Sequence, residues 1–226
     1  MRDIISLSVF IMYFFFIHKI SNYLLNKFKM TVFKVKTVIF PLEMIILFFI
    51  IFLSPLSFQE AGFVAGNIDY GIKFIVYLGI PLIVISSSSA IFLKKEDFYH
   101  IRYFNFEDKW MFIYLFFIVG IIEETIFRGF LQSYISLYIK GNFFILEYST
   151  ILASFIFMFF HLFNVFFKQE SIKAFLSMMP SRLIASLILG YGFQISESIL
   201  YTIIVHNLID GINIMAVYLK KKKLFK

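Results

Sequence analysis

The chain has 226 residues, of which 61% are hydrophobic and 15% charged, and its mean hydropathy is +0.88. A soluble single domain of this length does not present so much apolar surface to water, so the composition predicts an integral membrane protein. The chain contains no cysteine, which excludes disulfides, thiol nucleophiles and thiolate metal sites. Its formal net charge of +7 suits contact with anionic membrane lipids, and we expect no nucleic-acid partner.

Apolar segments recur along the whole chain, and a helix needs about 20 apolar residues to cross a bilayer. The candidates lie at 4–18, 38–58, 72–93, 110–139, 150–167, 182–195 and 198–219, with the sixth one short. We therefore predict an all-α fold, a polytopic bundle of about seven transmembrane helices. The first run lacks a clear small-residue cleavage site, so we interpret it as a retained span, with a signal-like segment as the alternative.

The connections between these segments differ in charge. Seventeen of the 21 Lys and Arg residues fall in the loops that share one side with the C-terminus, and Arg2, Lys73 and Lys140 fall on the other side. Since cytoplasmic loops carry the excess of Lys and Arg, we predict a multi-pass cell-membrane protein with its N-terminus outside and its C-terminus in the cytoplasm. Residues 94–110, with Tyr99, Tyr103 and Trp110, are interpreted as an interfacial stretch.

Two adjacent carboxylates, Glu123 and Glu124, lie inside the fourth apolar segment. An ionised side chain is costly there unless it is paired or lines a polar cavity, so the pair indicates a functional site. Glu124 and Arg128 are four residues apart on one helical face, where they can neutralise each other. Glu123 is rotated by about 100° from that face, which leaves it free for chemistry.

Further polar residues lie in the fifth and seventh segments. His161 and Asn164 lie near the end of the fifth segment, and His206, Asp210 and Asn213 form a stripe on one face of the seventh. A single intramembrane histidine is more often satisfied by a neighbouring carbonyl, but three polar helices together favour a shared site. Measured from the expected cytoplasmic ends of their spans, the two histidines and Glu123 can meet at one depth.

The three motifs Glu-Glu-x-x-x-Arg at 123–128, Phe-x-x-x-His at 157–161 and His-x-x-x-Asp at 206–210 resemble, in order, those of the CPBP intramembrane proteases, also called the Abi or type II CAAX-protease family. The resemblance divides the chain into a catalytic helical core at 110–219, N-terminal spans without a recognised signature at 1–109, and a basic tail at 220–226. Gly190-Tyr191-Gly192 fits the glycine-bearing helix that usually precedes the last motif. Asp210 stands where the eukaryotic enzymes often have Asn.

The resemblance implies an intramembrane endopeptidase in which Glu123 is the general base that activates water. His161 would hold or polarise that water, and His206 would donate to the developing oxyanion. Asp210 would orient His206, or join the oxyanion site if protonated. Arg128 would neutralise Glu124, the alternative being direct contact with a substrate carboxylate.

A metal mechanism is the alternative to this metal-free one, because Glu123, His161, His206 and Asp210 could supply two histidines and two carboxylates to zinc. The segments contain no His-Glu-x-x-His helix, and the ligand set alone does not decide between the two.

The sequence names no substrate. Its richness in Ile, Lys, Phe and Asn is typical of an AT-rich bacterial gene, so we expect peptide or protein precursors, as in bacteriocin or signal-peptide maturation or self-immunity, in place of prenylated CAAX proteins. One alternative is a non-proteolytic membrane scaffold that regulates a membrane-protein partner such as a sensor kinase. Another is a transporter whose carboxylates relay protons.

Overall fold

The computed structural model describes residues 2–96, 98, 106–166 and 170–225. Within these residues, seven helical segments are long and apolar enough to cross a membrane. We call them spans one to seven, and they are Arg2–Phe28, Val32–Leu53, Ile68–Phe92, Lys109–Tyr138, Tyr148–Phe166, Ile172–Ser196 and Ile199–Leu224. The predicted all-α, seven-span fold is confirmed.

Four spans are single helices, and three are built from consecutive shorter pieces. The single helices are α1 (Arg2–Phe28), α2 (Val32–Leu53), α11 (Ile172–Ser196) and α12 (Ile199–Leu224). Span three comprises α3 (Ile68–Phe74), the π-helix η1 (Ile75–Gly79), α4 (Ile80–Ser88) and the 3₁₀ turn η2 (Ser89–Phe92). Span four comprises α6 (Lys109–Phe117), α7 (Val119–Glu124), the π-helix η3 (Thr125–Gln132) and α8 (Ser133–Tyr138). Span five comprises α9 (Tyr148–Phe160) and α10 (Leu162–Phe166), preceded by an antiparallel hairpin of β1 (Asn142–Phe143) and β2 (Leu146–Glu147).

Polar caps fix where several helices begin. Thr31 accepts a hydrogen bond from the Lys34 N–H at the start of α2, and Asn67 accepts one from Tyr70 at the start of α3. These bonds satisfy N–H groups that have no partner within the helix. Spans six and seven are separated only by Glu197, in the left-handed conformation, and Ser198, which caps α12. Their predicted separation into two spans is therefore correct.

Several helix ends differ from the expected boundaries, most of all in spans one and six. Span one, expected at 4–18, continues to Phe28, and the sixth span, expected to be short, begins at Ile172. Hydropathy locates the apolar part of a helix, whereas the helix itself continues into polar flanks at the membrane surface. Pro180 lies inside α11 and does not end it. Tyr99 and Tyr103 of the expected interfacial stretch lie outside the described residues, as do Arg102, Lys168 and Lys226 of the charge count.

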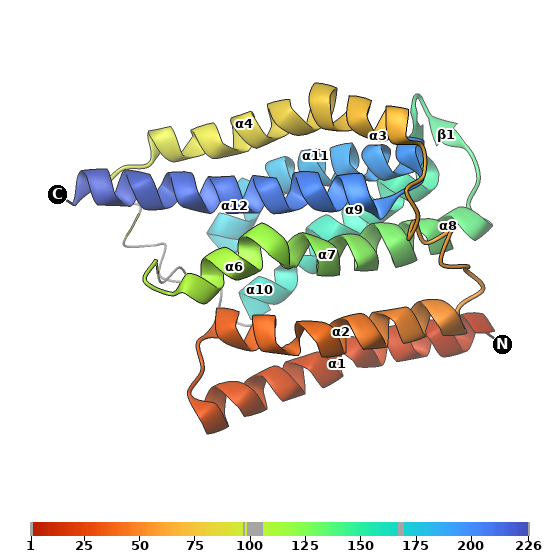
Figure 1. Ribbon diagram of the computed structural model, residues 1–226, viewed down its shortest axis with the longest axis horizontal. Coiled ribbons are helices and arrows are strands. Elements are labelled where there is room, and N and C mark those ends of the chain that lie inside the picture. Colours follow the sequence, from red (N-terminus) through yellow and green to blue (C-terminus); the bar gives the residue numbers. More distant parts are fainter. Residues whose placement is uncertain (1, 97, 99–105, 167–169, 226) are drawn as a thin grey trace.

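The spans run roughly side by side, and the two termini lie at opposite ends of the bundle (Figure 1). We call the end that holds the C-terminus and the connections after spans one, three and five the basic end. α12 contacts α3, α4, α6, α7 and α11 and is therefore central, while α1 and α2 form a hairpin packed beside span four. The main core, which includes Phe10, Leu47, Met111 and Phe130, lies between that hairpin and span four.

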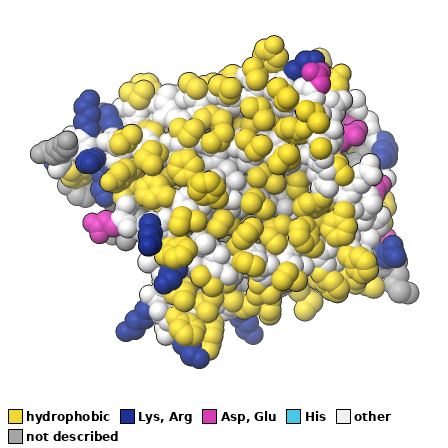
Figure 2. Space-filling view, viewed as in Figure 1, with side chains coloured by type: hydrophobic (Ala, Val, Ile, Leu, Met, Phe, Trp, Pro, Cys, Tyr) yellow, Lys and Arg dark blue, Asp and Glu magenta, His cyan; other side chains and the backbone are white. Residues whose placement is uncertain are grey.

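The outer surface matches a membrane environment. In Figure 2 hydrophobic side chains cover most of the visible face, and most of the visible Lys and Arg side chains lie in the half that carries the C-terminus. Large apolar residues such as Phe15, Phe52 and Tyr77 are about 70% exposed, which a lipid environment accommodates and water does not. The chain is thus a multi-pass membrane protein.

Candidate active site

The first motif forms a buried ion pair. Arg128 Nε lies 3.3 Å from Glu124 Oε2, and both side chains are excluded from solvent. Arg128 also donates through Nη2 to the carbonyl and the hydroxyl oxygen of Ser186 in α11, at 3.0 and 3.1 Å. Its guanidinium lies over the ring of Phe157. The predicted pairing of Glu124 with Arg128 is present, and it joins spans four, five and six.

The helix that carries this motif is not a regular α-helix. A π-helix, η3, begins at Thr125, directly after the two glutamates, and continues to Gln132. π-helical turns are rare and occur frequently at functional sites, because the wider turn redirects the side chains around it. The four-residue spacing of Glu124 and Arg128 predicts a pair for α-helical geometry. The Glu124–Arg128 pair forms nonetheless.

The third motif meets the first through His206, which is 6% exposed. His206 Nδ1 lies 2.6 Å from Glu124 Oε1. Its other nitrogen, Nε2, lies 3.6 Å from Glu123 Oε2 and 3.6 Å from Asp210 Oδ2. An ionised carboxylate only accepts hydrogen bonds, so Nδ1–H donates to Glu124. Asp210, which we expected to orient His206, lies against Nε2, and Glu124 is bonded to Nδ1.

His161 approaches the same region from the end of α9. Its Nδ1 lies 3.0 Å from the carbonyl oxygen of Phe157 one turn earlier, and this bond fixes the ring while leaving Nε2 free to face other groups. Among the described residues no hydrogen bond or ion pair joins His161 to Glu123. The two side chains instead line one cavity.

That cavity, of about 210 Å³, is bounded by spans one, two, four and five. Tyr13, Glu43 and Glu123 line one part of it, and Ser21, Lys36 and Asn164 line another. Ser21 lies eight residues after Tyr13 on α1, hence about 12 Å closer to the basic end. The cavity therefore extends from the glutamates toward the basic end. The side chain of Glu123 is 30% exposed, whereas that of Glu124 is fully buried.

Sequence reasoning missed three polar contributors to this region. Tyr13 and Glu43 come from the first two spans, where no motif is recognised, although a carboxylate inside an apolar run is itself a signal. Asn207 Oδ1 accepts a hydrogen bond from the backbone N–H of Gly120 at 2.8 Å. This bond ties the seventh span to the fourth next to His206, and only helix packing could have revealed it.

The four residues considered as zinc ligands do not assemble as a metal site. Within the described ranges no group of three or more His, Asp or Glu side chains is arranged to hold a metal ion. Both histidines use Nδ1 for hydrogen bonds, to Glu124 and to the Phe157 carbonyl, which leaves Nε2 of each ring available, as in metal-bound histidines. No hydrogen bond or ion pair of the described residues joins His161 to Glu123, His206 or Asp210. His161 therefore does not join the other three residues in one ligand set, and the reaction proposed below uses no metal ion.

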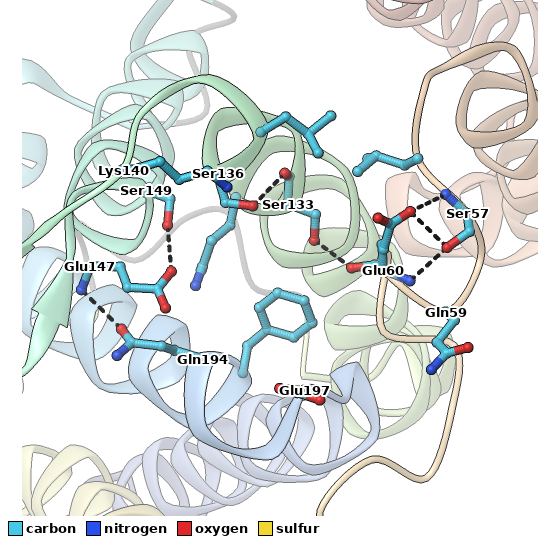
Figure 3. A pocket seen from close by; sticks show the side chains of 14 residues that line it. Ser57, Gln59, Glu60, Ser133, Ser136, Lys140, Glu147, Ser149, Gln194 and Glu197 are labelled. Atoms are coloured by element: carbon cyan, nitrogen blue, oxygen red, sulfur yellow. Dashed lines mark hydrogen bonds between the residues drawn. The ribbon is translucent and has the colours of Figure 1, made fainter.

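A second cavity, of about 640 Å³, lies at the end of the bundle opposite the basic end, and its polar groups bond largely to one another (Figure 3). Glu60 accepts from the backbone N–H and the hydroxyl of Ser57, both at 2.7 Å, and Ser149 donates to Glu147. The hydrogen bond from the Ser57 N–H, and to a smaller extent the one from the Ser57 hydroxyl, hold the pKa of Glu60 below its ordinary value. None of the six residues predicted for the site lines this cavity.

The fold and the site define a polytopic helical membrane protein with a glutamate–histidine cluster inside its bundle. A family model described as "Type II CAAX prenyl endopeptidase Rce1-like" matches residues 105–212, a segment that contains all three motifs. Over this segment, just under half of the chain, the expected resemblance to type II CAAX proteases is confirmed. Comparison with curated proteins and with solved structures gave no match.

Proposed function

We propose that this protein is an intramembrane endopeptidase that hydrolyses a peptide or protein precursor with water activated by Glu123. One observation carries the proposal. Glu123 lies 3.6 Å from His206 Nε2 and, together with His161, lines a cavity that extends toward the basic end of the bundle. A partly exposed carboxylate that contacts one histidine and shares a cavity with another is suited to general acid–base hydrolysis. The family match is to endopeptidases, which supports the same reaction.

In the first step Glu123 accepts a proton from water while the water oxygen attacks the peptide carbonyl carbon. His161 uses Nδ1 for the Phe157 carbonyl, which leaves its Nε2 as an acceptor for the second hydrogen of that water. The proposed nucleophile is therefore held between a carboxylate and an imidazole, both of which line the cavity.

The attack places a negative charge on the former carbonyl oxygen. His206 Nε2–H would donate to that oxyanion, a contribution of roughly 3 to 4 kcal/mol in other enzymes. Glu124 keeps the hydrogen of Nδ1 in place and so orients the ring. Glu123 then returns its proton to the leaving nitrogen, the oxyanion re-forms the carbonyl as the C–N bond breaks, and a carboxylic acid and an amine are released.

Arg128 and Asp210 have supporting roles in this proposal. Arg128 compensates the charge of Glu124, and its hydrogen bonds to Ser186 leave it facing α11 and not the cavity. A structural role for Arg128 is favoured over contact with a substrate carboxylate for that reason. Asp210 Oδ2 lies 3.6 Å from His206 Nε2, the nitrogen that would donate to the oxyanion, and helps to fix the position of the ring.

The surroundings indicate where the substrate comes from. We propose that the N-terminus lies outside and the C-terminus in the cytoplasm, because the basic end carries most of the Lys and Arg residues. The cavity then opens toward the cytoplasm and receives precursors there, such as bacteriocin or signal-peptide precursors in a bacterium. Membrane lipids are its other partners.

The experiment compares peptides from cells that produce the protein, its Glu123→Gln variant or neither. The proposal expects cleavage products that are present only with the unaltered protein. Identical peptide profiles with the unaltered protein and with Glu123→Gln, at equal amounts of folded protein, would favour a scaffold or transporter instead.

A further inference from the structure

Glu43 is a buried carboxylate that the proposed reaction does not use. It lies in the middle of α2 and is 7% exposed. The hydroxyl of Tyr13 donates to its Oε1 at 3.5 Å, and its Oε2 has no hydrogen-bond partner. Burial of a carboxylate oxygen without a partner is unfavourable, so this position calls for a donor that the protein itself does not provide.

Among the described residues no cation lies within ion-pair distance of Glu43, and the charge of Lys36 acts on it only from farther along the cavity. None of the ion pairs of these residues includes Glu43. Arg128 is paired with Glu124, and Lys36, seven residues before Glu43 on α2, places its Nζ over the ring of Tyr114. Two carboxyl groups, those of Glu43 and Glu123, line the cavity. Lys36 also lines it, but its ammonium lies over the Tyr114 ring, closer to the basic end.

The cavity combines these two carboxyl groups with apolar walls. Phe14, Ile39, Ile126 and Phe160 are among its lining residues. Its volume of about 210 Å³ is below the roughly 300–1,000 Å³ of complete small-molecule sites, so it suits one part of a larger substrate. Lys and Arg side chains combine an apolar stem with a charged tip, which matches apolar walls that lead to a buried carboxylate.

We infer that Glu43, with Tyr13 beside it, forms a subsite that binds a Lys or Arg side chain of the peptide substrate next to the bond hydrolysed by Glu123. The inference rests on the proposed function, because the ligand is part of that substrate. It gives the first two spans a role in specificity, since both residues come from the α1–α2 hairpin. A cation both donates to Oε2 and compensates its charge, which a backbone amide does not do.

Binding tests this subsite independently of cleavage. The purified full-length Glu123→Gln protein in detergent is titrated with an acetylated, amidated pentapeptide of Phe and Leu that carries Lys at its centre, and with the same peptide carrying norleucine. Glu123→Gln prevents hydrolysis and removes the other cavity carboxylate as a competing partner. We expect the Lys peptide to bind at least about tenfold more tightly, a preference that a desolvated charge pair readily provides.

The added substitution Glu43→Gln should reduce that preference to less than about threefold. Glu197→Gln, which changes an exposed carboxylate in the turn before α12, should leave it unchanged. Glu43→Asp keeps the carboxylate but withdraws it by one methylene from the cavity and should weaken the Lys preference, which keeps the subsite testable if Glu43→Gln does not fold. Equal binding of the Lys and norleucine peptides to the Glu123→Gln protein would overturn the subsite. Absence of cleavage with the Lys preference intact would instead count only against the proposed protease.

Discussion

Glu124 and His206 are joined by a 2.6 Å hydrogen bond between Oε1 and Nδ1, although 82 residues separate them in the chain. The same carboxylate is paired with Arg128 through its other oxygen. Glu124 thus connects the first motif to the third, and it compensates one cation while orienting the histidine nearest to Glu123. The two adjacent glutamates have different surroundings, because Glu124 is enclosed and Glu123 reaches the cavity.

Substitution of Glu124 by Gln should destabilise the protein. The amide of Gln carries no charge, so Arg128 would be buried without its counter-ion, and the hydrogen bond to His206 would be weakened. Removal of one partner from a buried ion pair costs about 3 to 5 kcal/mol. Thermal unfolding in detergent measures the effect, with the exposed Glu197→Gln as the control. An unchanged melting temperature for Glu124→Gln would show that the pair has no such role.

Substitution of Gly120 by Ala should disturb the packing of spans four and seven. A Cβ atom at Gly120 would lie 2.7 Å from Asn207 Oδ1 and 3.1 Å from the carbonyl oxygen of Ile203. We expect a loss of about 1 to 3 kcal/mol in the free energy of unfolding, as is usual for overpacking. Combined with Asn207→Ala, which removes one of the two contacts, Gly120→Ala should cost less than it does alone. Strictly additive effects would mean that the two residues do not interact.

Substitution of Asp210 distinguishes the metal-free mechanism from a metal-dependent one. Since Glu124 and not Asp210 binds His206 Nδ1, Asp210→Asn should keep substantial activity, and Asp210→Ala should lose less than His206→Ala. A metal ligand behaves differently, because the loss of its charge lowers metal occupancy and activity together. Turnover and zinc content are measured on the same preparations. Near-complete loss of both in Asp210→Asn would reject the metal-free mechanism.

The orientation in the membrane is tested with reporters. A reporter fused after Lys226 should report the cytoplasm, and one inserted near Gly66, in the connection between spans two and three, should report the outside. An odd number of spans places these two positions on opposite sides. Reporters on the same side would contradict the seven-span arrangement.

Much of this structure follows from simple patterns in the sequence. The spans are visible because a membrane helix needs a long apolar run, and the Glu124–Arg128 pair follows from a four-residue helical spacing. The bond between Glu124 and His206 does not follow, because sequence spacing carries no information on how two distant helices rotate against each other. The π-helix at Thr125–Gln132 depends on tertiary packing in the same way. Glu43 could have been noticed as an isolated carboxylate in span two, but its place in the cavity required the structure.

The central claim is that Glu123 activates water, and the most direct measurement is the turnover of the purified Glu123→Gln variant in liposomes on a substrate identified by peptide profiling. Gln has the shape of Glu and cannot accept the proton of water, so the variant should keep the melting temperature of the unaltered protein and lose activity by about 10²-fold or more. Retained cleavage by a folded Glu123→Gln protein would contradict the assignment of Glu123 as the general base.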